Sequence, residues 1–337
     1  MTSFTVYFSH LRARVDGKEE ILAHTVLTVT LNPSIDRTIA LPSLAVGEIN
    51  RASTITLHPG GKGVNVSRAA RAYGVATHAI FIGGKLGEAW MSAELDKAAI
   101  AHTVISVGDS IRSNMTIVEE SGLVTKINEP GSTLSRDDIE SVKRALSEQS
   151  LAGNWVIFAG RLNPGLAPTV YAELATYAKS QGAKVAVDSS GPEFAEAVKA
   201  AAVDLVKPNH HELSELVGRT LITIEDVITA AREVIAGGVE TVLVSMGADG
   251  AILVTVDGAT HCEPTTKVHG TPVGAGDILL GIFIAAGADV AALEKAISWS
   301  AASVPLPGTS IPSPAQAGAV AVRTRSDFDR ARVLVEA

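Results

Sequence analysis

The sequence predicts an α/β protein with a doubly wound, mostly parallel sheet flanked by helices and a small separate β-sheet. Short apolar runs such as Trp155-Val156-Ile157-Phe158-Ala159 are typical of strands that are buried on both faces. From residue 154 onward such runs alternate with helical segments, and strands connected through helices lie parallel. Short β-prone segments around residues 37–57 and 110–128 predict the small sheet, which is called the lid below.

Composition excludes several classes of protein. The chain has 337 residues, of which 46% are hydrophobic and 19% charged, so it can bury a large core and is not disordered. A net charge of −8 argues against nucleic acid or an anionic membrane as a partner. The longest apolar run, 278–288, is too short to span a bilayer. Cys262 is the only cysteine, which excludes an internal disulfide and favours a cytoplasmic location.

The first half of the chain supplies the first strands and the lid. Residues 1–24 lack the continuous apolar stretch of a secretory signal and are expected to form an N-terminal extension. A β-branched run over 25–31 predicts the first buried strand, and 79–82 predicts another, followed by a helix over 87–98. The turn 119–122 lies between two β-prone segments and predicts a hairpin in the second part of the lid.

The second half alternates regularly, and we expect one domain over residues 25–320 with a C-terminal helix over 321–337. Predicted strands end at Ala159, Val187, Val206 and Ser245. The predicted helices between and after them cover 168–180, a segment ending at 201, 211–217 and 224–236.

Gly274-Ala275-Gly276-Asp277 directly precedes an apolar helical run. The small residues allow backbone NH groups to converge where a helix begins, and unpaired donors and the macrodipole there favour an anion. A carboxylate in that place is suited to accept a proton from a hydroxyl group that attacks a phosphate. The alternative is that Asp277 only caps the helix, because Asp is a preferred N-cap residue.

A second glycine-rich loop, Gly60-Gly61-Lys62-Gly63-Val64-Asn65, also precedes a helical pattern. Glycines allow a ligand to approach the backbone, and Lys62 and Asn65 add a cation and an amide. The spacing fits neither the phosphate loop of nucleotide hydrolases nor the dinucleotide fingerprint. A tight turn between a strand and a helix is the alternative.

Further polar residues follow predicted strands or flank the lid. Asp36 comes just after the first strand, where open α/β sheets bind ligands, although an ordinary turn would also place an acid there. Arg51, Arg112 and Asn114 flank the lid segments, and surface charge is the alternative interpretation for each.

Two other segments suit a nucleotide. Asn209 and Glu212 are three residues apart on the first turn of a predicted helix, so they face the same way and could hold Mg²⁺ through water. A helix cap with a first-turn acid is the alternative. The turn that contains Ser245, Gly247 and Gly250 could lie beneath a nucleotide or simply join two strands.

Together these motifs resemble those of the PfkB, or ribokinase-like, family of sugar kinases, over about residues 25–320. The two glycine-rich motifs, with Lys207-Pro208-Asn209-His210-His211-Glu212 between them, carry the resemblance. The run 28–36 is similar to 1-phosphofructokinases and tagatose-6-phosphate kinases. Residues 47–51 and 127–131 are more similar to the former.

The resemblance implies transfer of the ATP γ-phosphoryl group, with Mg²⁺, to a phosphorylated ketohexose. Fructose 1-phosphate is the substrate expected first, and tagatose 6-phosphate or fructose 6-phosphate are alternatives. It implies Asp277 as the base, with the anion hole formed by the NH groups of Ala275, Gly276 and Asp277 after Gly274. It further implies a homodimer through the lid. The implied binding residues are, for nucleotide and metal, Lys207, Asn209, Glu212, Ser245, Gly247 and Gly250, and for the sugar phosphate, Asp36, Arg51, Gly61, Lys62, Asn65, Arg112 and Asn114.

Two residues depart from the family pattern. Ile278 replaces the small or hydroxyl residue that usually follows the base, which would alter how closely a substrate approaches. Arg161 stands where the family commonly has serine and adds a cation near the expected cleft. A relative that binds ligands without turnover is therefore the alternative to an active kinase.

Overall fold

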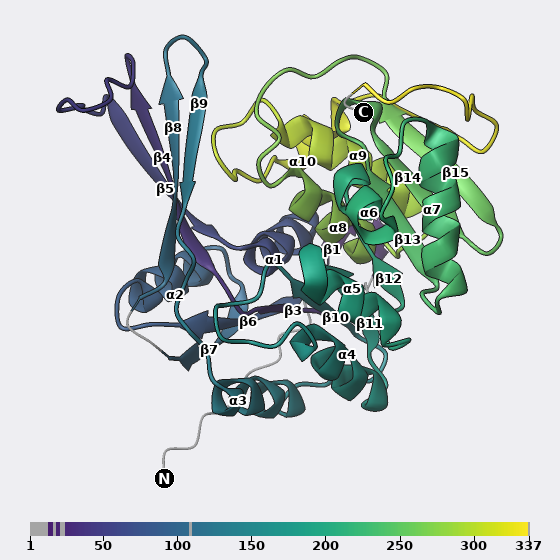
Figure 1. Cartoon of the computed structure of the whole chain (residues 1–337), viewed down its shortest axis with the longest axis horizontal. Coiled ribbons are helices and arrows are strands. Elements are labelled where there is room, and N and C mark those ends of the chain that lie inside the picture. The colour runs from purple at the N-terminus through teal and green to yellow at the C-terminus, as the bar shows by residue number, and fades with distance from the viewer. Residues whose placement is uncertain (1–12, 16–17, 21–23, 108–109, 336–337) are drawn as a thin grey trace.

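The computed structural model describes residues 13–15, 18–20, 24–107 and 110–335, and it confirms the predicted fold class. A ten-stranded sheet with the order β16-β15-β14-β13-β12-β11-β10-β3-β6-β7 carries helices on both faces, and a separate four-stranded sheet stands out from this body (Figure 1). The seven strands from β13 to β7 are parallel, and β14, β15 and β16 continue the sheet as an antiparallel edge.

Six strands of the main sheet, β3, β6, β10, β11, β12 and β13, lie close to the predicted positions, whereas β7, β14, β15 and β16 were not predicted as strands. The strands of this sheet are β3 Val26–Thr30, β6 Thr77–Gly83, β7 Ala101–Ser106, β10 Trp155–Ala159, β11 Lys184–Asp188, β12 Leu205–Val206, β13 Thr241–Ser245, β14 Ala251–Thr255, β15 Gly258–Pro264 and β16 Val322–Arg325. All residues of β3 and β10 are buried, as expected for strands covered by helices on both faces.

The helices form two layers around this sheet. They are α1 Lys62–Tyr73, α2 Glu88–Lys97, α3 Arg136–Ser147, α4 Val170–Ser180, α5 Gly191–Lys199, α6 His210–Val217, α7 Ile224–Ala236, α8 Ala275–Ala285, α9 Val290–Ser303 and α10 Pro314–Gly318. One core cluster joins α3 to α7 with the sheet, and a second joins α1, α8, α9 and α10. The helix α7 has the predicted bounds because a capping box of Thr223 and Asp226 begins it.

Helices α1 and α8 pack so closely that a glycine is required between them. Gly281 lies in the middle of α8, and a Cβ atom there would lie 2.8 Å from the carbonyl oxygen of Val66 and 3.0 Å from Cβ of Ala69. This close approach aligns the first turns of the two helices, which both begin at glycine-rich motifs.

The lid is the sheet β5-β4-β8-β9, formed by β4 Ser34–Leu41, β5 Thr54–Gly60, β8 Arg112–Glu119 and β9 Val124–Asn128. The β8–β9 pair is the predicted hairpin. Residues opposite one another share a face of the sheet. Asp36, His58 and Asn114 lie on one face, and Ile39, Ile55 and Ile117 lie on the other.

The predicted C-terminal helix over 321–337 is wrong for the described residues. Val322–Arg325 forms β16, which pairs antiparallel with β15, and residues 326–335 contain no helix. Successive side chains of this segment point to opposite faces of the sheet, as they do in a strand. Val322 packs against the core and the Thr324 hydroxyl contacts Cys262 Sγ at 3.2 Å, whereas Arg323 pairs with Glu263.

At the other end of the chain, β1 Ala13–Val15 and β2 Lys18–Glu20 pair as a two-stranded sheet, and the other residues of the extension before His24 lie outside the described part. Among the described residues, we find no helix with the length and apolar character needed to cross a membrane.

We predict that Gly281→Ala lowers the free energy of unfolding by about 1–3 kcal/mol, because the added methyl group forces α1 and α8 apart. This cost exceeds the gain in helix propensity of roughly 1 kcal/mol. Gly318→Ala is the matched control, since a Cβ atom at that helical position meets nothing within 4 Å. Urea denaturation of both variants tests the prediction, and equal midpoints would contradict it.

Candidate functional site

The parallel strands deliver a set of charged residues to one edge of the sheet. Asp188 ends β11, Lys207 follows β12, and Ser245 ends β13. This edge is where open α/β sheets bind ligands. The first turns of α1 and α8 add Lys62, Asn65 and Asp277 to the same region, as the contacts below show.

Asp277 does not cap helix α8. The N-cap residue is Gly274, whose φ of 77° favours glycine, and no side chain makes a capping hydrogen bond. Asp277 is instead buried, and its Oδ2 accepts a hydrogen bond of 2.8 Å from Nδ2 of Asn65 on α1. The interpretation as a mere cap is therefore wrong, and the two glycine-rich motifs form one site.

The expected anion hole at the start of α8, called the cradle below, does not consist of three free backbone NH groups. The NH of Ala275 donates to the carbonyl oxygen of Pro272 at 3.3 Å, whereas the NH groups of Gly276 and Asp277 have no acceptor within the described part of the chain. The ammonium of Lys207 lies beside them, 3.4 Å from the place that a Cβ atom on Gly276 would occupy. Two amides and one lysine therefore surround this position.

Asp188 is the site residue that the sequence interpretation missed. It is fully buried, and its carboxylate pairs with Lys62 Nζ at 2.7 Å and Lys207 Nζ at 3.2 Å. The two lysines hold the pKa of Asp188 below its usual value against the effect of burial. The available signal was a carboxylate at the carboxyl end of a buried strand, the same signal that singled out Asp36.

The pKa of Asp277 is raised from 3.8 to about 7. Burial is the largest cause, and the negative charge of Asp188 adds to it, while Lys62 and the Asn65 hydrogen bond act in the opposite direction. Burial by itself would lower the pKa of Lys62, but the charges of Asp188 and Glu212 raise it. Asp277 therefore exchanges a proton near neutral pH while Lys62 remains charged.

Asn209 and Glu212 form a capping box at the start of α6. The Asn209 side chain accepts a hydrogen bond from the NH of Glu212, and Glu212 Oε2 accepts one from the NH of Asn209, both at 2.8 Å. Glu212 Oε1 also lies 3.6 Å from Lys62 Nζ. The described residues contain no group of three or more histidine, cysteine, aspartate or glutamate residues that could hold a metal by themselves.

The turn after β13 lies beside Asn209. Ser245 forms a β-bridge with Asn209, and the short helix Gly247–Asp249 follows. Gly250 has φ of 79°, and a Cβ atom there would lie 2.1 Å from the carbonyl oxygen of Cys262, so packing alone requires this glycine.

The C-terminal segment braces the same turn. The NH of Val335 donates to Asp249 Oδ2 at 2.7 Å, and Arg332 pairs with Oδ1 at 3.3 Å. Nothing in the sequence pattern connected these distant residues with the turn.

A polar cluster around Asp36 lies on the lid. Asp36 Oδ1 accepts hydrogen bonds from the Ser34 hydroxyl at 2.7 Å and from Asn114 Nδ2 at 3.2 Å. A Cβ atom on Gly60 would lie 2.4 Å from the Asp36 carboxylate, so this glycine makes room for the acid. Gly61 has φ of 99° and lies against the backbone of Pro33. Burial raises the pKa of Asp36, although its two hydrogen bonds oppose the rise.

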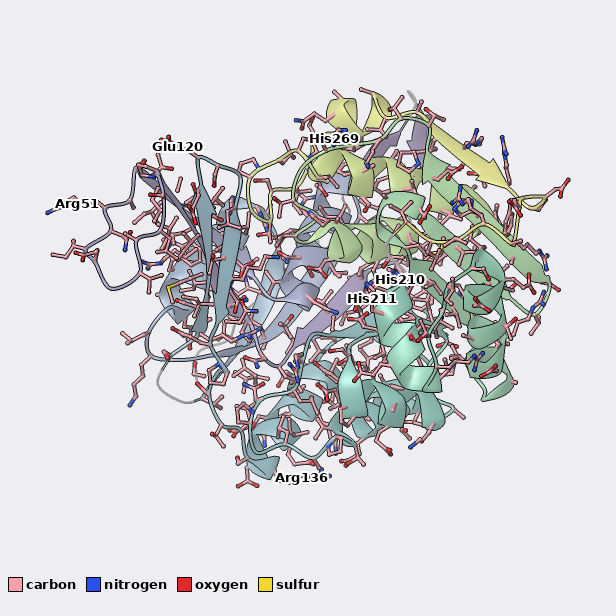
Figure 2. All side chains as sticks on the ribbon, turned by 45° about the horizontal axis from the view of Figure 1, so that its top comes forward. Arg51, Glu120, Arg136, His210, His211 and His269 are labelled. Carbon is pink, nitrogen blue, oxygen red and sulfur yellow. The ribbon has the colours of Figure 1, made fainter. Side chains whose placement is uncertain are left out.

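The two predicted arginine ligands lie in different places. Arg112 begins β8 opposite Ser34, two residues before the position opposite Asp36. Burial, together with the charge of Arg161, lowers the pKa of Arg112. Arg161, which departs from the family pattern, is therefore close enough to act on Arg112. Arg51 lies at the outer side of the lid and points into solvent, away from α8 (Figure 2). A single chain does not bring Arg51 to the site.

Ile278 does not approach the site. It is buried in the core cluster that contains α8 and α1. Any effect of this residue on the approach of a substrate would therefore act through the packing of α8 and not through an exposed side chain.

Comparison with known proteins yields consistent matches. Residues 29–315 match the model of the pfkB family carbohydrate kinase. The 1-phosphofructokinase of Rhodobacter capsulatus is 35% identical over 305 residues, covering 88% of this chain and 95% of the relative. The ATP-dependent 6-phosphofructokinase isozyme 2 of Escherichia coli is 34% identical, covering 82% and 90%.

Solved structures agree with these matches. The phosphofructokinase-2 of Escherichia coli in complex with substrates and products has a TM-score of 0.82 and 29% identity, covering 87% of this chain and 97% of that one.

The raised pKa of Asp277 predicts that Asp277→Asn stabilises the protein in a pH-dependent way. Because the folded-state pKa is above the unfolded value of 3.8, this group lowers the free energy of unfolding as pH rises from about 4 to about 7. We expect the variant to be more stable by about 2–4 kcal/mol at pH 8, with the difference vanishing near pH 4. Denaturant titrations at several pH values measure this difference in stability, and a difference that is independent of pH would refute the raised pKa of Asp277.

Proposed function

Because the chain belongs to the pfkB family of carbohydrate kinases, we propose that it transfers the γ-phosphoryl group of ATP to a hydroxyl group of fructose 1-phosphate. The observation that carries the proposal is the buried Asp277, which is hydrogen-bonded to Asn65 rather than to its own helix and lies beside two amides and Lys207. Identity of 35% to a 1-phosphofructokinase over most of both chains supports the choice of sugar.

In the proposed reaction Asp277 is the general base. The sugar hydroxyl oxygen forms a bond to the γ-phosphorus, the bond from that phosphorus to the bridging oxygen breaks, and ADP leaves. The hydroxyl proton passes to the Asp277 carboxylate, whose pKa of about 7 suits a base at neutral pH. The hydrogen bond from Asn65 to Oδ2 holds the carboxylate in one orientation and leaves Oδ1 for the hydroxyl.

The moving phosphoryl group would lie in the cradle at the start of α8. The NH groups of Gly276 and Asp277 and the ammonium of Lys207 can receive its oxygen atoms, and the positive end of the helix dipole adds to their effect. Asp188 keeps Lys207 in place and is itself stabilised by Lys62. Donors that are fixed before the substrate arrives need little reorganisation during the reaction.

We assign the nucleotide to the neighbouring edge, with Asn209, Ser245, Gly247 and Gly250 along it. The two predicted Mg²⁺ ligands, Asn209 and Glu212, already accept hydrogen bonds from each other's backbone NH groups. They therefore fit an ion that keeps most of its water and is held mainly by phosphates. Such an ion would neutralise phosphate charge when bound. Glu212 is the carboxylate that would face its water shell.

We assign the sugar to the space between the lid and α1. Asp36 and Asn114 would bind sugar hydroxyl groups, together with Gly61, Lys62 and Asn65. Arg112 would bind the existing phosphate, with Arg161 as a second cation. Arginine suits this role because its planar donors bind phosphate in pairs.

We also propose that the chain forms a homodimer through the lid. The outer face of the lid carries Ile39, Ile55, Ile117 and Ile127, and the side chains of Ile55 and Ile127 are 54% and 48% exposed. A sheet with one apolar face needs a partner to cover it, and a second lid is the surface of matching shape and character. Arg51, exposed on the lid, would then serve the partner's site.

A cytoplasmic location remains our prediction from the cysteine content.

The function is tested by an ADP-release assay with fructose 1-phosphate, fructose 6-phosphate and tagatose 6-phosphate. We predict the highest kcat/KM with fructose 1-phosphate. Asp277→Asn should lower kcat by roughly 100-fold or more with little change in ATP affinity, because only the proton acceptor is lost. Ligand binding without turnover by any of the sugars would rule out the kinase proposal, and a near-normal kcat of the variant would remove Asp277 from its role.

We further predict that Arg112→Ala raises KM for fructose 1-phosphate by about tenfold or more and leaves KM for ATP unchanged, because one charge-assisted contact to the sugar phosphate is lost. Steady-state kinetics with each substrate varied in turn measures both values. Arg161→Ala is the companion variant. If KM responds to Arg161→Ala alone, the phosphate lies on Arg161 instead.

A further inference from the structure

A groove of about 640 Å³ runs along the outer side of α1, between the end of α2 and residues 310–311. Its volume falls within the range of about 300–1,000 Å³ that small-molecule sites have. Its polar lining consists of His58 from β5, Arg68 and Arg71 from α1, and Ser310, with Ile311 and two alanines as apolar walls. None of the residues assigned above to base, nucleotide or sugar lines it.

The lining carries positive charge and no acid. Arg68 and Arg71 are one helical turn apart on α1, and His58 lies across from them on the lid. Three acids act on Arg68 by their charge, and each has other contacts. Glu94 pairs with Lys97 at 2.6 Å, Asp36 accepts hydrogen bonds from Ser34 and Asn114, and Asp277 accepts one from Asn65. Two arginines and a hydroxyl group in a groove of this size are the donor set that a phosphate group requires.

One ring nitrogen of the lining residue His58 is unsatisfied within the described part of the chain, but it is not exposed to the groove and lies 3.0 Å from the place that a Cβ atom on Gly308 would occupy. His58 Nδ1 is buried and has no hydrogen-bond partner among the described residues. Burial and the charge of Arg68 lower the pKa of His58, so the ring is neutral at pH 7 and makes hydrogen bonds without adding charge.

Arg68 connects the groove with the base. Its Nη1 donates to the carbonyl oxygens of Pro59 and Thr309 and, at 3.1 Å, to Oδ1 of Asn65. The Nδ2 of the same Asn65 amide donates to Asp277 Oδ2 at 2.8 Å. Arg68 therefore fixes which way the Asn65 amide points, and that amide in turn orients the carboxylate of Asp277.

We propose that this groove binds a small phosphate-bearing metabolite, and that binding there slows the reaction at Asp277 by drawing Arg68 away from Asn65. The first part stands on the groove alone, and the second rests on the proposed function. An anion in the groove competes for the Arg68 guanidinium. Asn65 then loses the partner that fixes its amide, and Asp277 is held less firmly in the orientation that accepts the proton.

The binding experiment uses inorganic phosphate as the probe, titrated calorimetrically into the full chain at constant ionic strength. We expect Arg71→Ala to weaken one class of phosphate sites by roughly tenfold or more, and Arg112→Ala to weaken a different class. Arg144→Ala is the matched control, because Arg144 is likewise in the last turn of its helix but lies on α3. Unchanged binding in Arg71→Ala, or an equal loss in Arg144→Ala, would overturn the groove as a site.

Arg71→Gln serves as a second variant, since it keeps an amide donor for the bond that Arg71 Nε makes to the carbonyl oxygen of Ala99 at 3.0 Å. It should lose phosphate binding while keeping the thermal stability of the parent chain. Loss of binding only in variants that have also lost stability would count against the groove.

The kinetic experiment adds inorganic phosphate at saturating ATP and fructose 1-phosphate. We expect kcat of the parent chain to fall by at least about twofold, and kcat of Arg71→Ala to be unaffected by phosphate. Phosphate that binds the groove without changing kcat would refute the coupling through Arg68. Absence of any turnover would instead refute the proposed function, and the binding result would still stand.

Discussion

The carboxylate of Asp188 lies at the end of a central strand with no contact to solvent, and it joins two lysines from different parts of the chain. A buried charge is tolerated only when opposite charges and hydrogen bonds surround it. Lys62 comes from the start of α1, and Lys207 from the segment that follows β12. The pairing therefore ties the first helix to the middle of the sheet and places both cations beside the start of α8.

This arrangement sets the charge of the site as well as its shape. Asp188 raises the pKa of Asp277, and Lys62 lowers it, so the proton affinity of Asp277 depends on the balance between them. Burial is the largest cause that raises the pKa of Asp277 to about 7, which is far above the ordinary range of an aspartate. A site of this kind trades stability for function, because an ionised Asp277 without full compensation is unfavourable in the folded protein.

The packing of α1 on α8 fixes the position of Asp277 relative to Asn65. Gly281 allows the two helices to touch, and Asn65 and Asp277 meet at the ends of that contact. Arg68, one turn further along α1, extends the same row of hydrogen bonds to the groove along the outer side of α1. The base, the helix contact and the groove thus form one continuous structure, in which a change at one end alters the orientation of a side chain at the other.

Local patterns in the sequence determined most of the fold. The bounds of α7 and β13 were predicted correctly, because a capping box and a β-branched run act on neighbouring residues. The resemblance of two glycine-rich motifs also identified the family before any contact was known. By contrast, a helix was predicted where β16 forms, since the open edge of β15 lies about 60 residues earlier in the chain and is visible only in the folded sheet.

The charges around the base could be decided only by the tertiary structure. Asn65 and Asp277 are 212 residues apart, and Lys62 and Asp188 are 126 apart, so no periodicity or spacing relates them. The sequence determined that Asp277 follows a small-residue turn at the start of a helix, a pattern that by itself favours a cap, whereas the other motifs of the chain favour a base. Only the tertiary structure showed that Asp277 is buried among charges and does not cap its helix, because free energies of desolvation and charge pairing depend on distance in space and not on separation along the chain.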